Sequence, residues 1–191
     1  IITRTPFRIS FFGGGTDYPV WYEKNGGAVL STSIDKYCYI FAREFPPFFP
    51  HKLRIVWSKI ELVNHPDHIE HPTARETLKY LGLHEGIEIH HNGDLPARSG
   101  LGSSSSFTVG LLNAFHAMNG RMASKESLAR EAIRIEQEVI KENVGSQDQV
   151  WAAYGGMNRI SFLPDDRFEV SPLIMDIGRR DELLSNLILV F

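Results

Sequence analysis

Cysteine and long hydrophobic runs are both scarce in this sequence. Only Cys38 among the 191 residues is a cysteine, which excludes an internal disulfide framework and is typical of a reducing compartment. No apolar run approaches the roughly 20 residues of a membrane-spanning helix, and the opening segment IITRTPFRIS has no signal-peptide core. The sequence therefore predicts a cytoplasmic protein without a membrane partner.

A surplus of charge of either sign is also absent. Lys and Arg number 20 and Asp and Glu number 23, which gives a formal net charge of −3. This balance offers no basic surface for nucleic acid, so we expect no nucleic-acid partner. A chain that is 42% hydrophobic and 23% charged has the composition of a folded globular protein, and its length allows one or two domains.

Strand patterns come first in the chain, and helical patterns cluster in its middle. Period-two alternation predicts a strand over 34–43 with Cys38 and Ile40 on one face. Apolar spacing predicts helices over 104–118 and 124–142, the second with Ser124 as its N-cap. The other expected elements are a helix over 73–81 and strands over 2–12, 53–57, 87–91, 157–162 and 168–170. This order predicts an α+β fold rather than a regular βαβ alternation.

The segment from Asp94 to Ser106 reads DLPARSGLGSSSS and is expected to connect a strand to a helix. Glycines let a backbone approach an anion closely, the first N–H groups of a helix point toward it, and serine hydroxyls add donors or a Mg²⁺ ligand. A flexible Gly/Ser linker is the alternative, but a linker does not usually run directly into an amphipathic helix. The segment therefore favours a phosphate site, although it matches neither Walker A nor GxGxxG.

Three carboxylates have two interpretations each. Glu136 falls in the apolar arc of its helix, where a carboxylate needs a cation, a metal or several donors, so it is either in a buried Glu–Arg pair or a metal ligand. Asp148, expected in a polar loop after that helix, is either an ordinary loop residue or part of a site. Asp17 in GGGTDYP either accepts backbone bonds within a glycine turn or binds sugar hydroxyls.

Two other groups of residues favour a structural role. The histidines of NHPDHIEH, which are His65, His68 and His71, match no common metal spacing and lie between prolines, so we expect a surface loop. Trp57 is expected in the core rather than as an adenine platform. HExxH, paired-cysteine and GxSxG motifs are all missing from the sequence.

Taken in order, the motifs resemble those of the GHMP kinases, the family of galactokinase and of homoserine, mevalonate and phosphomevalonate kinases. The segment PARSGLGSSSS is similar to the family's Pro-x-x-x-Gly-Leu-Gly-Ser-Ser loop, RISFFGGGTDY to its N-terminal substrate motif, and Glu136 with Asp148 to its metal ligand and catalytic aspartate. The resemblance covers residues 1 to about 162. It implies the family's N-terminal domain, similar to domain 2 of ribosomal protein S5, across residues 1–191.

The resemblance also implies a role for each matching residue. Asp148 would orient or deprotonate the attacking hydroxyl, with Arg8 keeping it ionised, and Ser104 and Glu136 would bind Mg²⁺. Substrate binding would fall to Gly14, Gly15, Thr16 and Asp17, with Lys36 and Arg98 as contacts for a substrate phosphate. ATP would be held by the loop residues Pro96, Ser99, Gly100, Leu101, Gly102, Ser103, Ser104, Ser105 and Ser106.

The implied activity is ATP-dependent phosphorylation of a sugar or sugar phosphate. Galactokinases have Glu-His before Thr-Asp-Tyr where this chain has Gly14-Gly15, which argues against galactose. The GGGTDYP, TSIDKY and SGLGSSSSF segments look most like the bacterial branch of the family that phosphorylates the anomeric hydroxyl of D-glycero-D-manno-heptose 7-phosphate. A fucokinase-like sugar kinase and a non-catalytic sugar-binding or regulatory protein with this fold are the alternatives.

The third motif of the family, in a ferredoxin-like C-terminal domain, is absent from the sequence. The last residues, LILVF at 187–191, have the pattern of a buried strand that stops without a turn or polar tail. We therefore expect these residues to be a piece of a longer chain, and we expect the piece alone to lack turnover.

Overall fold

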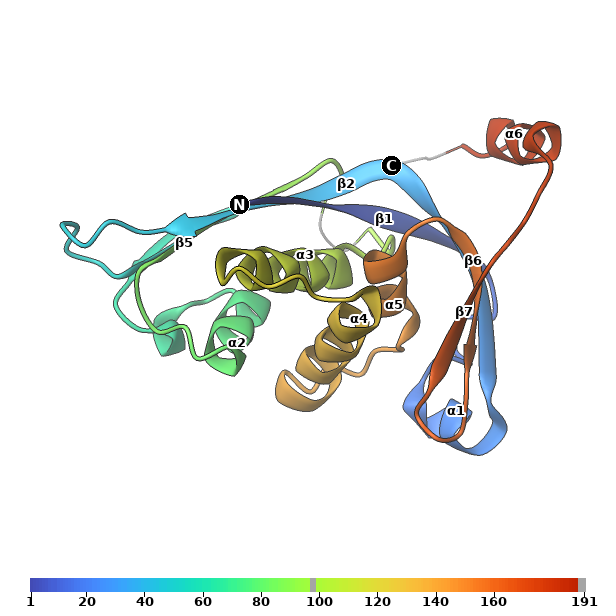
Figure 1. The fold of residues 1–191 in the computed structure, drawn as a ribbon, viewed down its shortest axis with the longest axis horizontal. Coiled ribbons are helices and arrows are strands. Elements are labelled where there is room, and N and C mark those ends of the chain that lie inside the picture. The colour runs from blue at the N-terminus through green and yellow to red at the C-terminus, as the bar shows by residue number, and fades with distance from the viewer. Residues whose placement is uncertain (97–98, 189–191) are drawn as a thin grey trace.

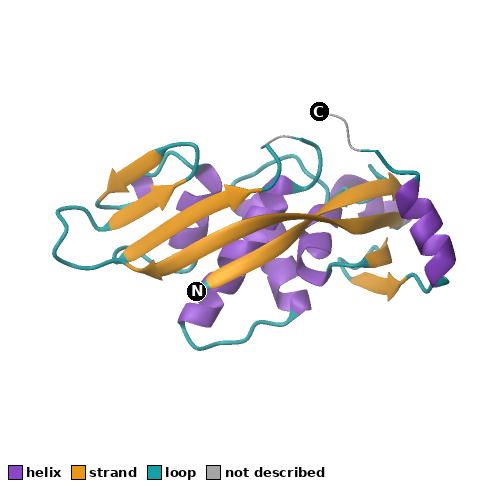
Figure 2. Ribbon diagram, turned by 90° about the horizontal axis from the view of Figure 1, so that it is seen from above, coloured by secondary structure: helices purple, strands orange, loops and turns teal. Residues whose placement is uncertain are grey.

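A computed structural model describes residues 1–96 and 99–188 of the chain. One curved sheet forms the upper layer of the molecule, and helices α2 (Pro72–Tyr80), α3 (Ser103–Met118), α4 (Lys125–Arg134) and α5 (Gln147–Tyr154) pack beneath it (Figure 1). Seen from above, the opposite face of the sheet is open over most of its strands (Figure 2). Segregated helices on one face of a largely antiparallel sheet define an α+β fold, as the sequence predicts.

The sheet is organised around one long strand. β2 (Gly27–Glu44) pairs along one edge with β1 (Ile2–Phe12) and along the other with both β5 (Ile87–Gly93) and β6 (Met157–Phe162). Beyond β5 lie β3 (Leu53–Val56) and β4 (Ile60–Val63), and beyond β6 lies β7 (Phe168–Pro172). All these pairs are antiparallel except the parallel pair of β3 with β5.

Alternation along the strands determines which face is buried. Cys38, Ile40 and Ala42 of β2 point into the main core, as the period-two pattern predicts, and they pack with residues of β3, β5 and α3. Burial raises the pKa of the Cys38 thiol to about 12, so this cysteine stays protonated and unreactive. A second cluster joins β6 to α5 around Trp151, and a third joins α3, α4 and α5.

Helix α3 lies at the centre of the molecule, between the sheet and the other helices. It is buried on nearly all sides, which is expected for a helix that is apolar around its circumference. Gly110 lets it lie close to β1, because a Cβ there would be 2.8 Å from the Thr5 hydroxyl oxygen. This contact brings the middle of α3 close to β1.

The structure confirms most of the expected elements and corrects others. Asp148 lies in the first turn of α5 rather than in a loop, and the helix that begins after Ser124 becomes a π-helical turn, η2 (Ile135–Val139), instead of continuing to 142. The short elements α1 (Pro19–Asn25), η1 (Pro66–His68) and α6 (Ile177–Ser185) were not expected, nor was β4. Leu187 and Ile188 follow α6 outside any strand, and residues 189–191 lie outside the described part.

Of the residues that were given structural roles, Trp57, His65 and His68 lie as expected, whereas His71 packs against Phe107 instead of lying in a surface loop. Trp57 packs against the main core and donates a hydrogen bond to Glu61. His65 caps η1 and His71 caps α2 through their ring nitrogens. Across the described residues, no three His, Cys, Asp or Glu side chains are grouped to hold a metal. No helix in residues 1–96 and 99–188 is both long and apolar enough to cross a membrane.

Candidate active site

A cavity of about 300 Å³ is lined by half of the predicted site residues. Its walls come from β1, from the turn before α1, from the first turn of α3, from η2 and from the start of α5. The lining residues are Arg8, Asp17, Tyr18, Gly100, Gly102, Ser103, Ser104, Ser105, Glu136, Glu142, Val144, Gly145, Gln147, Asp148 and Gln149. Segments that are distant in sequence thus meet at one place.

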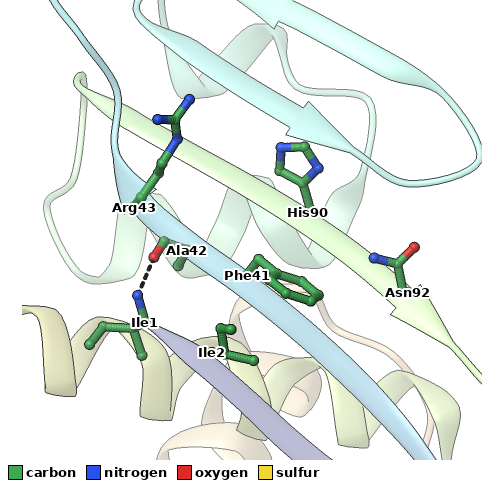
Figure 3. A pocket seen from close by; sticks show the side chains of 7 residues that line it. All are labelled: Ile1, Ile2, Phe41, Ala42, Arg43, His90 and Asn92. Atoms are coloured by element: carbon green, nitrogen blue, oxygen red, sulfur yellow. Dashed lines mark hydrogen bonds between the residues drawn. The ribbon is translucent and has the colours of Figure 1, made fainter.

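A larger cavity, of about 410 Å³, lies elsewhere (Figure 3). It is on the open face of the sheet, where Ile1, Ile2 and Phe41 lie near Arg43, His90 and Asn92. None of the predicted site residues lines it. Chemistry rather than size therefore identifies the smaller cavity as the candidate active site.

Arg8 and Asp148 form the central ion pair of this site. Nε and Nη2 of Arg8 donate to Oδ1 and Oδ2 of Asp148 at 2.7 and 2.8 Å, a bidentate arrangement that fixes both side chains. Nη1 of Arg8 donates to the carbonyl oxygen of Gly100 at 2.8 Å, and its backbone N–H donates to that of Leu101 at 3.1 Å. Arg8 therefore joins the candidate catalytic aspartate to the glycine-rich loop.

Arg8 was expected to keep Asp148 ionised by lowering the pKa of its carboxyl, but burial has the opposite effect. Burial raises the pKa of the Asp148 carboxyl, and the charge and hydrogen bonds of Arg8 lower it, with a net rise above the ordinary value. Arg8 therefore offsets desolvation without cancelling it. A carboxylate with a raised pKa is a stronger base than an ordinary aspartate.

Glu136 is buried, with 1% of its surface exposed, and η2 directs it toward α3 and α5. Its Oε2 accepts from Ser105 Oγ at 2.9 Å and from Gln149 Nε2 at 2.5 Å, and its Oε1 accepts from Thr108 Oγ1 at 2.6 Å. Among the described residues no arginine reaches it, so the expected alternative of a buried Glu–Arg pair is wrong. π-Helical turns occur frequently at functional sites.

These residues fit a Mg²⁺ ion. Burial raises the pKa of Glu136 to about 7 although Thr108, Ser105 and Gln149 lower it, so three neutral donors do not replace a cation. Gln149 is fully buried, and its Oε1 has no hydrogen-bond partner in the described part of the chain. Mg²⁺ prefers carboxylate, hydroxyl and water oxygens. The serine that contacts Glu136 is Ser105, whereas Ser104 is exposed and lines the same cavity.

Asp17 is buried beside Asp148 and joins two segments. Its Oδ1 accepts from the Gly15 N–H at 2.9 Å, and its Oδ2 accepts from the Gln147 N–H at 3.2 Å, at the start of α5. Gly145 packs so closely that a Cβ there would be 1.9 Å from Asp17 Oδ2. Asp17 thus accepts backbone hydrogen bonds in the glycine turn, as one interpretation predicts. It also lines the cavity, where the other interpretation places a carboxylate for sugar hydroxyls.

Several other predicted site residues do not reach this cavity. The Thr16 hydroxyl donates to the Gly13 and Ala28 carbonyls, and the Ser106 hydroxyl donates to that of Pro6. Lys36 is half-exposed and its ammonium lies 3.8 Å from Asp35. The cavity lining also does not include Gly14, Gly15, Pro96, Ser99 and Leu101. Arg98 lies outside the described residues.

Sequence reasoning missed three polar residues of the site. Thr108 faces Glu136 one turn after the serines, and Gln147 and Gln149 flank Asp148. The pattern of Gln-Asp-Gln was visible in the sequence, but with Asp148 assigned to a loop it could not be placed. In the first turn of α5, successive residues point in different directions, so Gln149 reaches Glu136 while Asp148 reaches Arg8.

Comparison with known proteins finds similarity to sugar kinases. The profile of the GHMP kinases N terminal domain matches residues 68–156. D-glycero-alpha-D-manno-heptose 7-phosphate kinase of Campylobacter jejuni is 28% identical over 214 residues, which cover all of this chain and 59% of the relative. A galactokinase of Chloroflexus aggregans is 28% identical over 167 residues, which cover 81% of this chain and 40% of the relative.

A solved structure is similar over nearly the same span. The crystal structure of a D-glycero-D-manno-heptose 1-phosphate kinase of Bacteroides thetaiotaomicron superposes with a TM-score of 0.83 at 27% identity, covering 95% of this chain and 62% of that one. Residues 68–156 match the N-terminal domain of the GHMP kinase family, and the chain has the mixed α+β fold of that domain. It spans about 60% of the length of the heptose kinases it matches.

Proposed function

We propose that the protein is an ATP-dependent sugar kinase that phosphorylates the anomeric hydroxyl of D-glycero-D-manno-heptose 7-phosphate. The observation that carries this proposal is the convergence of Arg8–Asp148, the glycine-rich loop and Glu136 on one cavity. Phosphoryl transfer requires positioning and charge stabilisation more than covalent chemistry. In this proposal residues 1–191 form the domain that binds ATP and sugar, and the protein acts in the cytoplasm.

Each part of the cavity has a task in the proposed reaction. Asp148 accepts the proton of the attacking hydroxyl, and Arg8 holds its carboxylate in one orientation. The loop from Gly100 to Ser103 offers backbone N–H groups to the ATP phosphates at the start of α3. Glu136 and Ser104 hold Mg²⁺, which neutralises charge on the phosphates when it is bound.

The glycine turn supports a substrate larger than galactose. A Cβ at Gly15 would have no atom within 4 Å, and one at Gly14 would meet only Gln147 Nε2, at 4.0 Å. Asp17, at the end of this turn, provides a carboxylate for sugar hydroxyls. The D-glycero-alpha-D-manno-heptose 7-phosphate kinase among the relatives also supports this substrate assignment.

Turnover of a sugar panel tests the proposal. The full-length protein is incubated with Mg²⁺, ATP and galactose, fucose, mannose, heptose or heptose 7-phosphate, and ADP release is followed together with ³¹P NMR of the product. We expect the highest kcat/KM with heptose 7-phosphate and a new anomeric phosphate. Faster turnover of another sugar would correct the substrate, whereas tight sugar binding without any turnover would identify a binding protein.

A further inference from the structure

Gln147 occupies a position between the two carboxylates of the proposed sugar site. It is the first residue of α5, its side chain is half-buried, and it lines the cavity together with Asp17 and Asp148. Its backbone N–H donates to Asp17 Oδ2 at 3.2 Å, so Asp17 fixes the start of the helix. The hydrogen bond of the Gln147 backbone to Asp17 thus fixes where the Gln147 side chain starts.

The carboxamide of Gln147 is oriented by β1. The Ser10 hydroxyl donates to Gln147 Oε1 at 3.0 Å, which satisfies the acceptor side of the amide. Nε2 carries two donors, and in the described part of the chain neither of them has an acceptor. An oriented amide with free donors beside a cavity is a binding group that needs no rearrangement before it acts.

The neighbouring turn leaves room for a ligand at this donor. A Cβ at Gly14 would lie 4.0 Å from Nε2 of Gln147. Because residues 13–15 are all glycine, no side chain of that turn competes for the amide. A side chain at position 14 would narrow the space in front of Nε2.

We propose that Nε2 of Gln147 donates a hydrogen bond to a hydroxyl oxygen of the bound sugar and so determines which sugars the site accepts. The inference rests on the proposed function and adds a specificity residue to it. Asp17 and Asp148 as carboxylates can only accept from a hydroxyl, whereas each sugar hydroxyl also has lone pairs to satisfy. Gln147 supplies the missing donor without a charge, and a sugar that lacks the hydroxyl leaves the amide unpaired.

Two substitutions separate the donor from the rest of the side chain. Gln147→Glu keeps an acceptor for Ser10 and removes the N–H donors but adds a negative charge, while Gln147→Met keeps the length and removes both functions without adding a charge. In the full-length protein we measure kcat and KM for heptose 7-phosphate and for ATP. The dissociation constant of the sugar without ATP is measured by calorimetry. Asn113→Leu, which changes an exposed carboxamide of α3, is the control.

Both Gln147 variants should raise the KM and the dissociation constant of the sugar by about tenfold, the effect of one hydrogen bond at the upper end of its usual range. The KM for ATP should stay within about twofold, and Asn113→Leu should match the wild type. Ser10→Ala should give a smaller rise, because the amide is then present but no longer oriented.

The outcomes distinguish this inference from the proposed function. Wild-type turnover with an unchanged sugar KM in both folded Gln147 variants would overturn the inference and leave the kinase assignment intact. Equal increases in the KM for ATP and for sugar would also overturn it, since they would indicate a disturbed helix. No binding and no turnover of any sugar by the wild type would overturn both proposals.

Discussion

The Arg8–Asp148 pair combines three functions in a few atoms. It fixes the carboxylate in a bidentate geometry, it connects β1 to the glycine-rich loop through Gly100, and it counteracts the desolvation of Asp148. A lysine at position 8 could not provide this planar, bidentate contact. The sequence indicated that the two residues act together, but not that Arg8 also anchors the loop.

Asp148→Asn tests the proton acceptor of the proposed kinase. The amide cannot accept a proton, so kcat should fall by about 10²- to 10⁴-fold. ATP binding should be nearly intact, because no loop residue is changed. Measurement of kcat and of the ATP dissociation constant checks this expectation, and a loss of ATP binding would show that Asp148 has a different role.

The contribution of the buried Thr108 hydroxyl to stability depends on its hydrogen-bond partner. Thr108 and Thr77 are both fully buried, but Thr108 donates to Glu136 whereas Thr77 Oγ1 has no partner among the described residues. Removal of the Thr108 hydroxyl leaves Oε1 of Glu136 without its donor, and removal of the unsatisfied Thr77 hydroxyl leaves no group without a partner.

Thr108→Val should therefore lower the free energy of unfolding by about 1–3 kcal/mol, the cost of one unsatisfied buried group. Thr77→Val, the same change of shape at an equally buried site, should leave stability unchanged or increase it. Urea unfolding of both variants checks the pair. Equal destabilisation would show that packing, rather than the bond to Glu136, determines the effect.

At the scale of elements, the start of α3 brings the loop and the ion pair together. Gly102 begins the helix with a φ of +76°, a conformation that favours glycine. A Cβ at this position would lie 3.3 Å from Arg8 Cγ and 3.5 Å from Asp148 Oδ2. The other end of the helix provides a comparison, since Gly120 has a φ of +67° and a Cβ there would be in open space.

Gly102→Ala and Gly120→Ala should each destabilise the protein by about 1–2 kcal/mol, because each forces an alanine into the left-handed region. Only Gly102→Ala should also reduce kcat, since its Cβ would be in tight contact with Arg8 Cγ and would displace the ion pair with Asp148. Thermal unfolding together with steady-state kinetics checks both effects. A normal kcat for Gly102→Ala would show that the ion pair tolerates displacement.

The elements also show where sequence patterns lose information. Period-two and helical spacing predicted the long strands and helices because burial of one face determines them. The π-helical turn at η2 and the short helix α5 were missed, since neither changes the apolar pattern enough to be visible. Their geometry depends on Glu136 and Gln149 meeting across two elements, which is a tertiary contact.

At the scale of the whole molecule, the core contains histidines that affect its response to acid. His71 and His91 contact Phe107 from two sides, at ring distances of 4.6 and 4.8 Å. Burial, with a smaller contribution from His71, lowers the pKa of His91 to about 4, and burial lowers that of His71 as well. Both rings are therefore neutral in the folded protein near pH 7.

The contribution of His91 to the free energy of unfolding should fall as the pH decreases from about 6.5 toward 4, whereas Glu136, whose pKa is raised to about 7, contributes with the opposite sign over an overlapping range. In this window the unfolded chain binds protons at His91 that the folded chain does not, so acid favours unfolding, while above about pH 6.5 this contribution to stability is complete. His91→Leu should remove the His91 contribution and make the protein relatively more stable at pH 5 than the wild type is, and His68→Gln, at an exposed histidine, should not. Urea unfolding at pH 7 and pH 5 checks this, and an unchanged slope for His91→Leu would contradict it.

The sequence by itself determined the fold class, the long elements and the identity of the main chemical groups of this protein. Hydrophobic periodicity and glycine-rich turns are local properties, and the resemblance of the motifs to those of the GHMP kinases implied the domain and the residue roles. Only the tertiary structure decided which groups meet. It joined Arg8 to Asp148, gave Glu136 three donors rather than an arginine and left Lys36 outside the cavity. Side chains more than 100 residues apart are brought together by packing of α3 and α5 against β1, and no local pattern encodes that distance.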